Sequence, residues 1–122
     1  MNPYPTATKC ILDILRSKNN SPIFYKMEMG VGKFYSLIEC LKESDINHLI
    51  VDSRCFSIDD LHSIIIDSEN QVIVFSDIHN MRKPLIDDIF LLKDLNKNII
   101  LTGDLDNSDL SRPQLNRLLI VE

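Results

Sequence analysis

The residues of this chain best suited to chemistry form one short stretch, Gly30-Val31-Gly32-Lys33. The stretch follows an apolar run, Pro22 to Tyr25, and precedes a helical pattern, Phe34 to Leu41. Glycines in such a place let successive backbone N–H groups close around a phosphate at the start of a helix, and the lysine then reaches the outer phosphates. The stretch therefore predicts a phosphate-binding loop with ATP or ADP as its ligand.

Two positions of that loop carry the wrong residue type. The full pattern, G-x-x-x-x-G-K-[ST], places a glycine before the variable residues and a hydroxyl after the lysine for Mg²⁺. Met27 stands at the first position and Phe34 at the second. The alternative interpretation is a tight strand-to-helix turn without a ligand. Phe34 separates the two cases: a ring packed in the core leaves the loop its shape, whereas a ring in the phosphate cavity excludes nucleotide.

Asp77 is the candidate catalytic acid. It follows the apolar run Val72 to Phe75 and is preceded by Ser76. In ATPases with a phosphate-binding loop, one carboxylate at such a strand end holds the water shell of Mg²⁺, and in many a second polarises the attacking water. Ser76 takes the first position and Asp77 the second, so the pair is broken and no metal site is predicted. The alternative role of Asp77 is to cap the end of the strand.

Two further positions are candidates for contacts with a nucleotide or a partner. Thr102 ends an apolar strand pattern, where a hydroxyl can sense a γ-phosphate. Arg117 closes the segment Ser111 to Arg117, where an arginine can reach a nucleotide held by a neighbouring subunit. Taken alone, Arg117 is more often a surface cation.

In order and spacing, these segments resemble the core of an AAA+ ATPase. Gly30 to Lys33 resembles the second half of that family's "GPPGVGKT" loop, and Phe75 to His79 resembles its "(I/F)DEIH" segment. Ile99 to Asp104 is similar to the "IILTSD" or "LLITGD" strand of the bacterial replication initiator and its regulatory relatives. The resemblance runs from about Ala7 to Glu122. It implies a three-layer α/β fold of the P-loop NTPase kind, with a five-stranded parallel sheet of order 5-1-4-3-2 between helices.

The departures from this family concern its catalytic parts. The threonine that binds Mg²⁺ in the family is Phe34 here, its Mg²⁺-side aspartate is Ser76, and its catalytic glutamate is the shorter Asp77. The sequence also ends at Glu122, after the last strand, without the family's helical lid. Each metal or arginine contact of such a site contributes several kcal/mol of transition-state stabilisation. Efficient ATP hydrolysis is therefore not expected.

The elements that must position these residues alternate between strand and helix patterns, which favours one α/β domain over residues 1–122. Helices are expected from Thr6 or Thr8 to Arg16, Lys33 to Ser44, Ser57 to Ile65 and Lys83 to Asp94. The third begins with a capping box, because Asp60 lies three residues after Ser57. Strands are expected at Ile23 to Met27, His48 to Asp52 (buried), Gln71 to Ser76, Asn98 to Thr102 and Leu118 to Val121.

The composition excludes several classes of protein. The net charge of −5 provides no basic field, so direct DNA binding is disfavoured. No apolar stretch is long enough to span a bilayer, and the first residues lack the apolar region of a signal peptide. Cys10, Cys40 and Cys55 show no metal-ligand spacing and are expected to be buried, reduced thiols, which indicates a cytoplasmic protein.

Three hypotheses follow for the function. The leading one is an AAA+-like module with little or no catalysis, which acts through protein–protein contacts in DNA replication or its regulation. Its partner would be an AAA+ ATPase, a helicase or loader, or a second copy, with Arg117 at the contact. The second is a nucleotide-binding ATPase that needs a partner subunit for hydrolysis, with Gly30, Gly32 and Lys33 on the nucleotide and Asp77 as its acid. The third, a DNA-binding module, is the least favoured.

Overall fold

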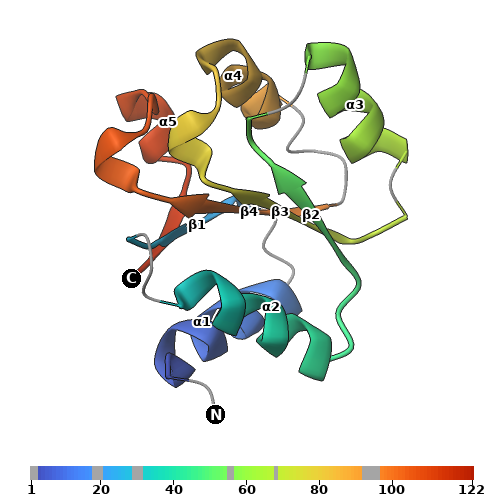
Figure 1. Cartoon of the computed structure of the whole chain (residues 1–122), viewed down its shortest axis with the longest axis vertical. Coiled ribbons are helices and arrows are strands. Elements are labelled where there is room, and N and C mark those ends of the chain that lie inside the picture. The colour runs from blue at the N-terminus through green and yellow to red at the C-terminus, as the bar shows by residue number, and fades with distance from the viewer. Residues whose placement is uncertain (1–2, 18–20, 29–31, 55–56, 68, 92–96) are drawn as a thin grey trace.

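The computed structural model describes residues 3–17, 21–28, 32–54, 57–67, 69–91 and 97–122. In this part of the chain, five parallel strands form one sheet in the order β2-β3-β4-β1-β5 (Figure 1). The expected sheet, 5-1-4-3-2, is therefore confirmed. The strands are β1 (Ile23–Lys26), β2 (His48–Asp52), β3 (Val72–Ser76), β4 (Asn98–Gly103) and β5 (Leu119–Val121). The helices are α1 (Pro5–Arg16), α2 (Lys33–Glu43), α3 (Ile58–Asp67), α4 (Lys83–Leu91) and α5 (Arg112–Leu115).

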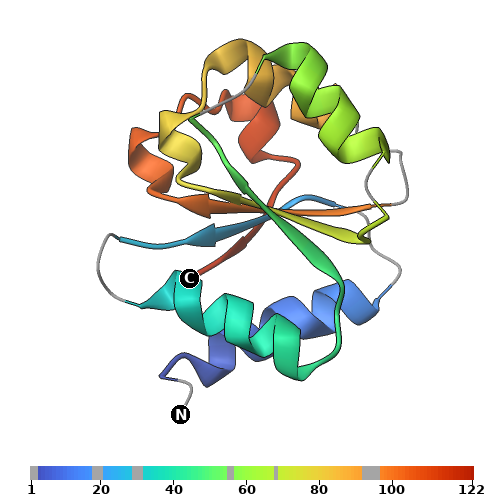
Figure 2. The ribbon, with the colours of Figure 1, turned by 45° about the vertical axis from the view of Figure 1, so that its right-hand side comes forward.

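Helices cover both faces of the sheet and make three layers. Figures 1 and 2 show α1 and α2 on one face and α3, α4 and α5 on the other. Because side chains alternate along each strand, the sheet contributes to two separate cores, one on each face. In β1, Phe24 packs into the core under α3 and α4, while its neighbours Ile23 and Tyr25 pack into the core under α1 and α2. A parallel sheet buried on both sides explains why its strands read as continuous apolar runs.

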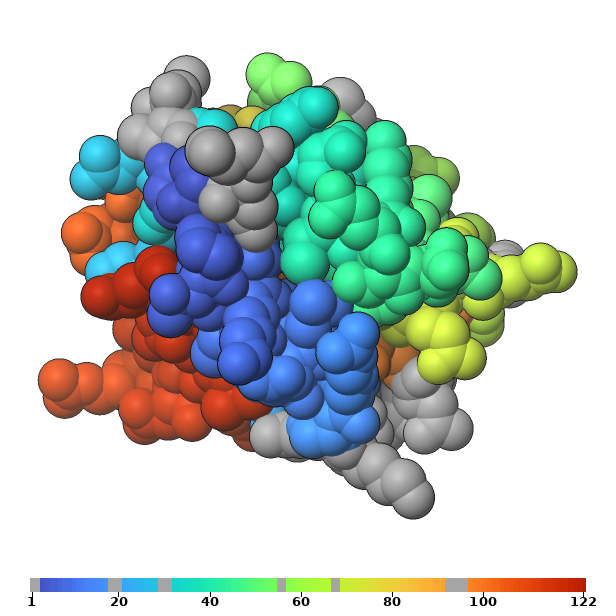
Figure 3. All heavy atoms as spheres, turned by 90° about the horizontal axis from the view of Figure 1, so that it is seen from below, coloured from blue at the N-terminus to red at the C-terminus, as the bar shows by residue number. Residues whose placement is uncertain are grey.

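Helices α1 and α2 together form the layer on one face of the sheet. Figure 3 looks onto this layer and shows the two helices side by side. Ile11 of α1 and Leu37 and Leu41 of α2 are completely buried. Their spacing places one apolar stripe of each helix on the sheet. The first turn of α1 is thereby brought close to the first turn of α2.

The start of α1 differs from the expectation that Thr6 or Thr8 caps it. The N-cap residue is Tyr4, and Pro5 occupies the first turn, where its missing N–H costs nothing. Thr8 lies inside the helix and is 2% exposed. Its hydroxyl donates to the backbone oxygen of Tyr4 at 3.0 Å, and the Thr8 N–H donates to the same oxygen at 3.2 Å. The Thr8 hydroxyl therefore bonds to backbone oxygens of the preceding turn, those of Tyr4 and Pro5, instead of capping the helix.

Two expectations about burial are wrong. The strand His48 to Asp52 was expected to be buried, but it is an edge strand in which only Val51 is buried. Its apolar residue Ile50 is 45% exposed, because an edge strand is covered less completely than a central one. Of the cysteines expected to be buried, Cys10 is exposed and Cys40 is half-buried, because each lies beside the apolar stripe of its helix. Cys55 lies outside the described residues.

Most helix ends agree with the sequence to within two residues. The capping box of α3 is confirmed: the Asp60 N–H donates to the Ser57 hydroxyl at 3.2 Å, and the Ser57 N–H donates to Asp60 at 3.4 Å. Positions 92–94 of the expected Lys83 to Asp94 helix lie outside the described residues. The short helix α5 was not expected, although Ser111 and Gln114 form a second capping box there. None of the helices in the described ranges is both long and apolar enough to cross a membrane.

Candidate functional site

The carboxyl ends of β1, β3 and β4 meet at one edge of the sheet, where the loops that follow them enclose a hollow. Two adjoining cavities of about 400 and 700 Å³ make up this hollow, which we call the strand-end groove. Such an edge is where open α/β sheets carry their ligands. The described residues that line it are Tyr4, Lys26, Met27, Glu28, Gly32, Lys33, Phe34, Ser76, Asp77, His79, Gly103, Asp104, Leu105, Asp106, Asn107 and Glu122.

Lys33, the predicted phosphate-binding lysine, lines both cavities but has its ammonium group engaged by the protein itself. Its Nζ donates to the backbone oxygen of Lys26 at 3.1 Å. The same atom lies 5.7 Å from the centre of the Tyr4 ring and 5.6 Å from that of Tyr25, within the range of cation–π attraction. We call Tyr4, Tyr25 and the Lys26 carbonyl the lysine cage.

The two rings of the lysine cage come from different elements. Tyr25 is the third residue of β1 and is completely buried, and its hydroxyl has no hydrogen-bond partner in the described structure. Burial, together with the nearby Tyr4, raises the pKa of the Tyr25 phenol. Tyr4 is half-buried, and its backbone oxygen accepts from the Thr8 hydroxyl. No pattern in the sequence predicts that Tyr4 or Tyr25 lies beside Lys33.

The loop itself is described only in part, since Gly30 and Val31 lie outside the described residues. Gly32 is the N-cap of α2 with a φ of 76°, a left-handed conformation that glycine adopts without strain. Phe34, at the position of the family's hydroxyl, packs against the core under α1 and α2 and also forms part of the wall of the larger cavity. Met27 packs against the same core.

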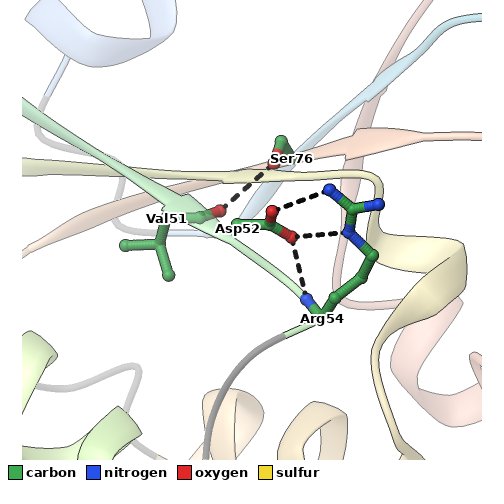
Figure 4. A network of polar contacts seen from close by, with 4 residues as sticks. All are labelled: Val51, Asp52, Arg54 and Ser76. Carbon is green, nitrogen blue, oxygen red and sulfur yellow. Dashed lines mark hydrogen bonds and ion pairs between the residues drawn. The ribbon is translucent and has the colours of Figure 1, made fainter.

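The carboxylate and hydroxyl at the end of β3 are not arranged as a metal-binding pair. Asp77 is half-buried in the groove wall, has a φ of 52° and begins a 3₁₀ turn, Ile78–Asn80. Its side chain makes no capping hydrogen bond to that turn. The Ser76 hydroxyl donates to the backbone oxygen of Val51 in β2 at 3.4 Å (Figure 4). Ser76 thus ties two strands together.

Beside Ser76, an ion pair closes the end of β2 (Figure 4). The Asp52 carboxylate accepts from the Arg54 side chain at 3.0 and 3.2 Å and from the Arg54 backbone N–H at 3.0 Å. The hydrogen bonds from the Arg54 side chain are the largest cause that holds the pKa of Asp52 below its usual range, and the hydrogen bond from the Arg54 backbone N–H is the second. Neither residue lines the strand-end groove.

Thr102, the predicted phosphate sensor, lies away from the groove. It is completely buried, and its hydroxyl donates to the backbone oxygen of Phe75 in β3 at 2.8 Å. It lines neither cavity. In this structure the hydroxyl of Thr102 therefore joins β4 to β3.

The next residues contribute a contact that sequence reasoning missed. Gly103 has a φ of 144°, and a Cβ added to it would lie 3.0 Å from both His79 Nδ1 and the backbone nitrogen of Ile78. The backbone N–H of Asp104 donates to His79 Nδ1 at 3.4 Å. This bond makes Nδ1 the acceptor of the imidazole and fixes the ring in the groove wall.

Arg117, the predicted contact residue, lies on the side of the sheet where the strands have their amino ends, opposite the strand-end groove. It is exposed and precedes β5, whose first residue, Leu119, pairs with Ile23 at the amino end of β1. Lys33 and Asp77 lie beyond the carboxyl ends of the strands. Arg117 therefore cannot reach the groove of its own chain.

The described lining of the strand-end groove carries more negative than positive side chains. Its described lining includes five carboxylates, from Glu28, Asp77, Asp104, Asp106 and Glu122, against the two lysines Lys26 and Lys33. Lys26 is paired with Glu122 at 3.2 Å. Among the described residues, no group of three or more His, Cys, Asp or Glu side chains is placed to hold a metal ion.

No protein-family profile and no curated protein sequence matches the chain, whereas many solved structures share its fold. The RuvB Holliday junction branch migration motor of Thermotoga maritima aligns with a TM-score of 0.62 at 16% identity over 84% of this chain and 38% of that one. A point variant of RuvB aligns with a TM-score of 0.68 at 15% identity, over 97% and 42% of the two chains. A DNA polymerase III gamma subunit-related protein of the same organism aligns with a TM-score of 0.63 at 13% identity, over 95% and 46%.

These likenesses show that the chain has a fold of the AAA+ P-loop ATPase kind. At such low identity they show the fold alone. The chain spans less than half the length of the solved chains that it matches.

Proposed function

We propose that this protein is an AAA+-like module that works through protein–protein contacts and hydrolyses ATP slowly or not at all. The observation that carries the proposal is the state of Lys33. Its ammonium group, which a nucleotide site needs free for phosphate, is held by a backbone oxygen and two aromatic rings. A groove with more carboxylates than lysines also repels the negative charge of a triphosphate.

The contact that we propose involves Arg117. Its side chain is exposed, and no ion pair or hydrogen bond of its guanidinium group is found within the described residues. Arg117 lies at the amino ends of the strands, away from the groove, and is therefore available to a partner. This partner would be an AAA+ ATPase, a helicase or loader, or a second copy of this chain. Arg112, the first residue of α5, is also exposed and is a matched control.

The process that we propose is DNA replication or its regulation. Two observations support it. The strand from Ile99 to Asp104 is similar to that of the bacterial replication initiator. Structures that share the fold include a Holliday junction motor and a protein related to a DNA polymerase III subunit. The proposal concerns a role beside such machines, and the acidic charge of the chain disfavours its own binding to DNA.

Calorimetric titration with ATP and ADP, with and without Mg²⁺, tests the absence of a working nucleotide site. We expect no saturable binding by the wild-type protein and the same result for Lys33→Ala. Lys42→Ala, on the same helix, is the control for a loss of positive charge. Tight, Mg²⁺-dependent ATP binding that Lys33→Ala abolishes would overturn the proposal and favour the alternative, an ATPase that needs a partner subunit for hydrolysis.

The contact is tested separately. Sedimentation measures self-association of the wild type, Arg117→Glu and Arg112→Glu. Association with an AAA+ protein is measured by affinity capture from the native host, followed by mass spectrometry. We expect Arg117→Glu to weaken one of these associations and Arg112→Glu to leave it intact. Equal behaviour of the two variants in both measurements would remove Arg117 from the contact.

A further inference from the structure

Part of the lysine cage would have to move before an anion could reach Lys33. The Lys26 carbonyl belongs to β1, and the Tyr25 ring is completely buried in the core beneath α1 and α2. Neither can leave without disrupting the sheet. Tyr4 is different, because it precedes α1, is half-buried and lines the smaller cavity of the groove.

Tyr4 is also the part of the cage that belongs to the start of α1, as the N-cap residue of that helix. Its backbone oxygen accepts from both the N–H and the hydroxyl of Thr8, one turn later. Thr8 is 2% exposed, and its neighbour Ala7 is buried in the core under the same helix. The first turn of α1 therefore sets the Tyr4 ring against the ammonium group of a lysine in the first turn of α2.

From these contacts we infer that the first turn of α1 acts as an autoinhibitory element. Tyr4 competes with anions for Lys33, so phosphate binds to the strand-end groove only when the Tyr4 ring has moved away. This inference rests on the proposed function and deepens it, because it names what keeps the groove closed to phosphate. It adds a second state, in which the same groove accepts an anion.

The energetics make such a switch feasible. A cation–π contact of this kind changes the population of the caged lysine by about two- to thirtyfold. The hydrogen bond to Lys26 remains when the Tyr4 ring is removed, so the lysine is released only in part. The effect to measure is therefore a shift in the accessibility of Lys33 of that size.

The test measures how fast Lys33 reacts with an amine-selective acylating reagent, read by mass spectrometry in the folded protein. The main variant is Tyr4→Leu, which keeps apolar bulk on the core and removes the aromatic face. Tyr4→Phe keeps the ring and is the matched control. Lys42, on the exposed surface of α2, is the reference lysine within each molecule.

We expect Lys33 to react about two- to thirtyfold faster in Tyr4→Leu, with an unchanged rate at Lys42 and in Tyr4→Phe. Added inorganic phosphate should slow the reaction of Lys33 in Tyr4→Leu and leave the wild type unaffected. A rate at Lys33 that is unchanged in Tyr4→Leu overturns the cage. A raised rate that phosphate does not lower overturns the competition with anions.

Thr8→Val provides a second variant should Tyr4→Leu fail to fold. It keeps the shape of the side chain and removes one of the two hydrogen bonds that Thr8 donates to the Tyr4 oxygen, so Lys33 should react faster than in the wild type. A wild-type rate in Thr8→Val counts against the role of the first turn. All of these readouts differ from the ATP titration, which can overturn the proposed function while the cage persists.

Discussion

Three residues that the sequence marked as candidates for the site, or that stand beside such candidates, direct their polar atoms to backbone carbonyls. Lys33 donates to Lys26, Ser76 to Val51, and Thr102 to Phe75. Each hydrogen bond satisfies a polar group within the protein. At the scale of the residue, these three donors bond to the backbone instead of pointing into the groove.

Gly103 allows a direct test of how tightly the groove wall is built. Gly103→Ala should lower the free energy of unfolding by about 2–4 kcal/mol, because its Cβ would lie 3.0 Å from His79 Nδ1 and from the Ile78 nitrogen, at an unfavourable φ. Urea denaturation measures the effect. Gly32→Ala is the control: its φ is also positive, but nothing lies within 4 Å of the added Cβ, so a loss of about 1–2 kcal/mol is expected. Equal losses in the two variants would contradict this account.

Asp52 provides a prediction of pH dependence. Because the hydrogen bonds from Arg54 lower its pKa in the folded protein, the carboxylate contributes stability above its ordinary pKa and loses that contribution as the pH falls through the lowered value. Arg54→Met removes the side-chain hydrogen bonds and keeps the backbone one, so it should raise the pKa of Asp52 toward its ordinary range and reduce the loss of stability on acidification. A carboxyl-carbon NMR titration checks the pKa. Arg112→Met, far from Asp52 on α5, should leave it unchanged, and an unshifted Asp52 in Arg54→Met would refute the assignment.

At the scale of the element, two capping boxes start α3 and α5, and each satisfies backbone N–H groups that the first turn leaves unpaired. In α5, Gln114 also donates to Asp87 of α4 at 2.6 Å, so this cap joins two helices as well. Short elements of this kind depend on such contacts, because few backbone hydrogen bonds hold them together.

The cap of α3 can be tested by a single hydroxyl. Ser57→Ala should cost about 1 kcal/mol of stability, because the N–H of Asp60 loses its acceptor. Thermal or urea unfolding measures the change. Ser63→Ala, at an exposed position within the same helix, should have a much smaller effect. A similar loss in both variants would mean that helix propensity, and not the cap, sets the stability of α3.

The strands and their order could be predicted because a buried parallel strand has a strong pattern and the sheet order followed from the resemblance to AAA+ cores. Other features could not. Since both faces of β4 are buried, its sequence does not show toward which face Thr102 points. Tyr4 is far from Lys33 in the chain, and the two meet only because α1 packs beside α2. Contacts of this kind depend on tertiary packing, which periodicity does not contain.

At the scale of the molecule, the sheet has a protected centre and two edges. β3, β4 and β1 each have a strand on both sides, whereas β2 and β5 have only one neighbour. Ile50 of β2 and Ile120 of β5 are each more than two-fifths exposed, at 45% and 44%. The two cores on either side of the sheet both depend on the central strands.

Amide hydrogen exchange should reflect this arrangement. The hydrogen-bonded amides of β1, β3 and β4 should exchange only on global unfolding, while those of β2 and β5 should also exchange through local opening and hence faster. Exchange followed by NMR at several urea concentrations separates the two routes. If β2 were as protected and as sensitive to urea as β4, the edge would have to be covered in solution, for instance by a partner.

The position of β1 has a consequence for how the protein folds as it is synthesised. Both neighbours of β1 come much later in the chain, and the ion pair that closes its end, Lys26 with Glu122, joins residues 96 positions apart. The apolar residues Ile23, Phe24 and Tyr25 therefore have no strand to pair with on either side until β4 has left the ribosome. Such a high contact order slows folding and leaves an aggregation-prone strand exposed in the nascent chain. The central strand that borders the groove is thus the one that gains its second neighbour last, when β5 joins the sheet.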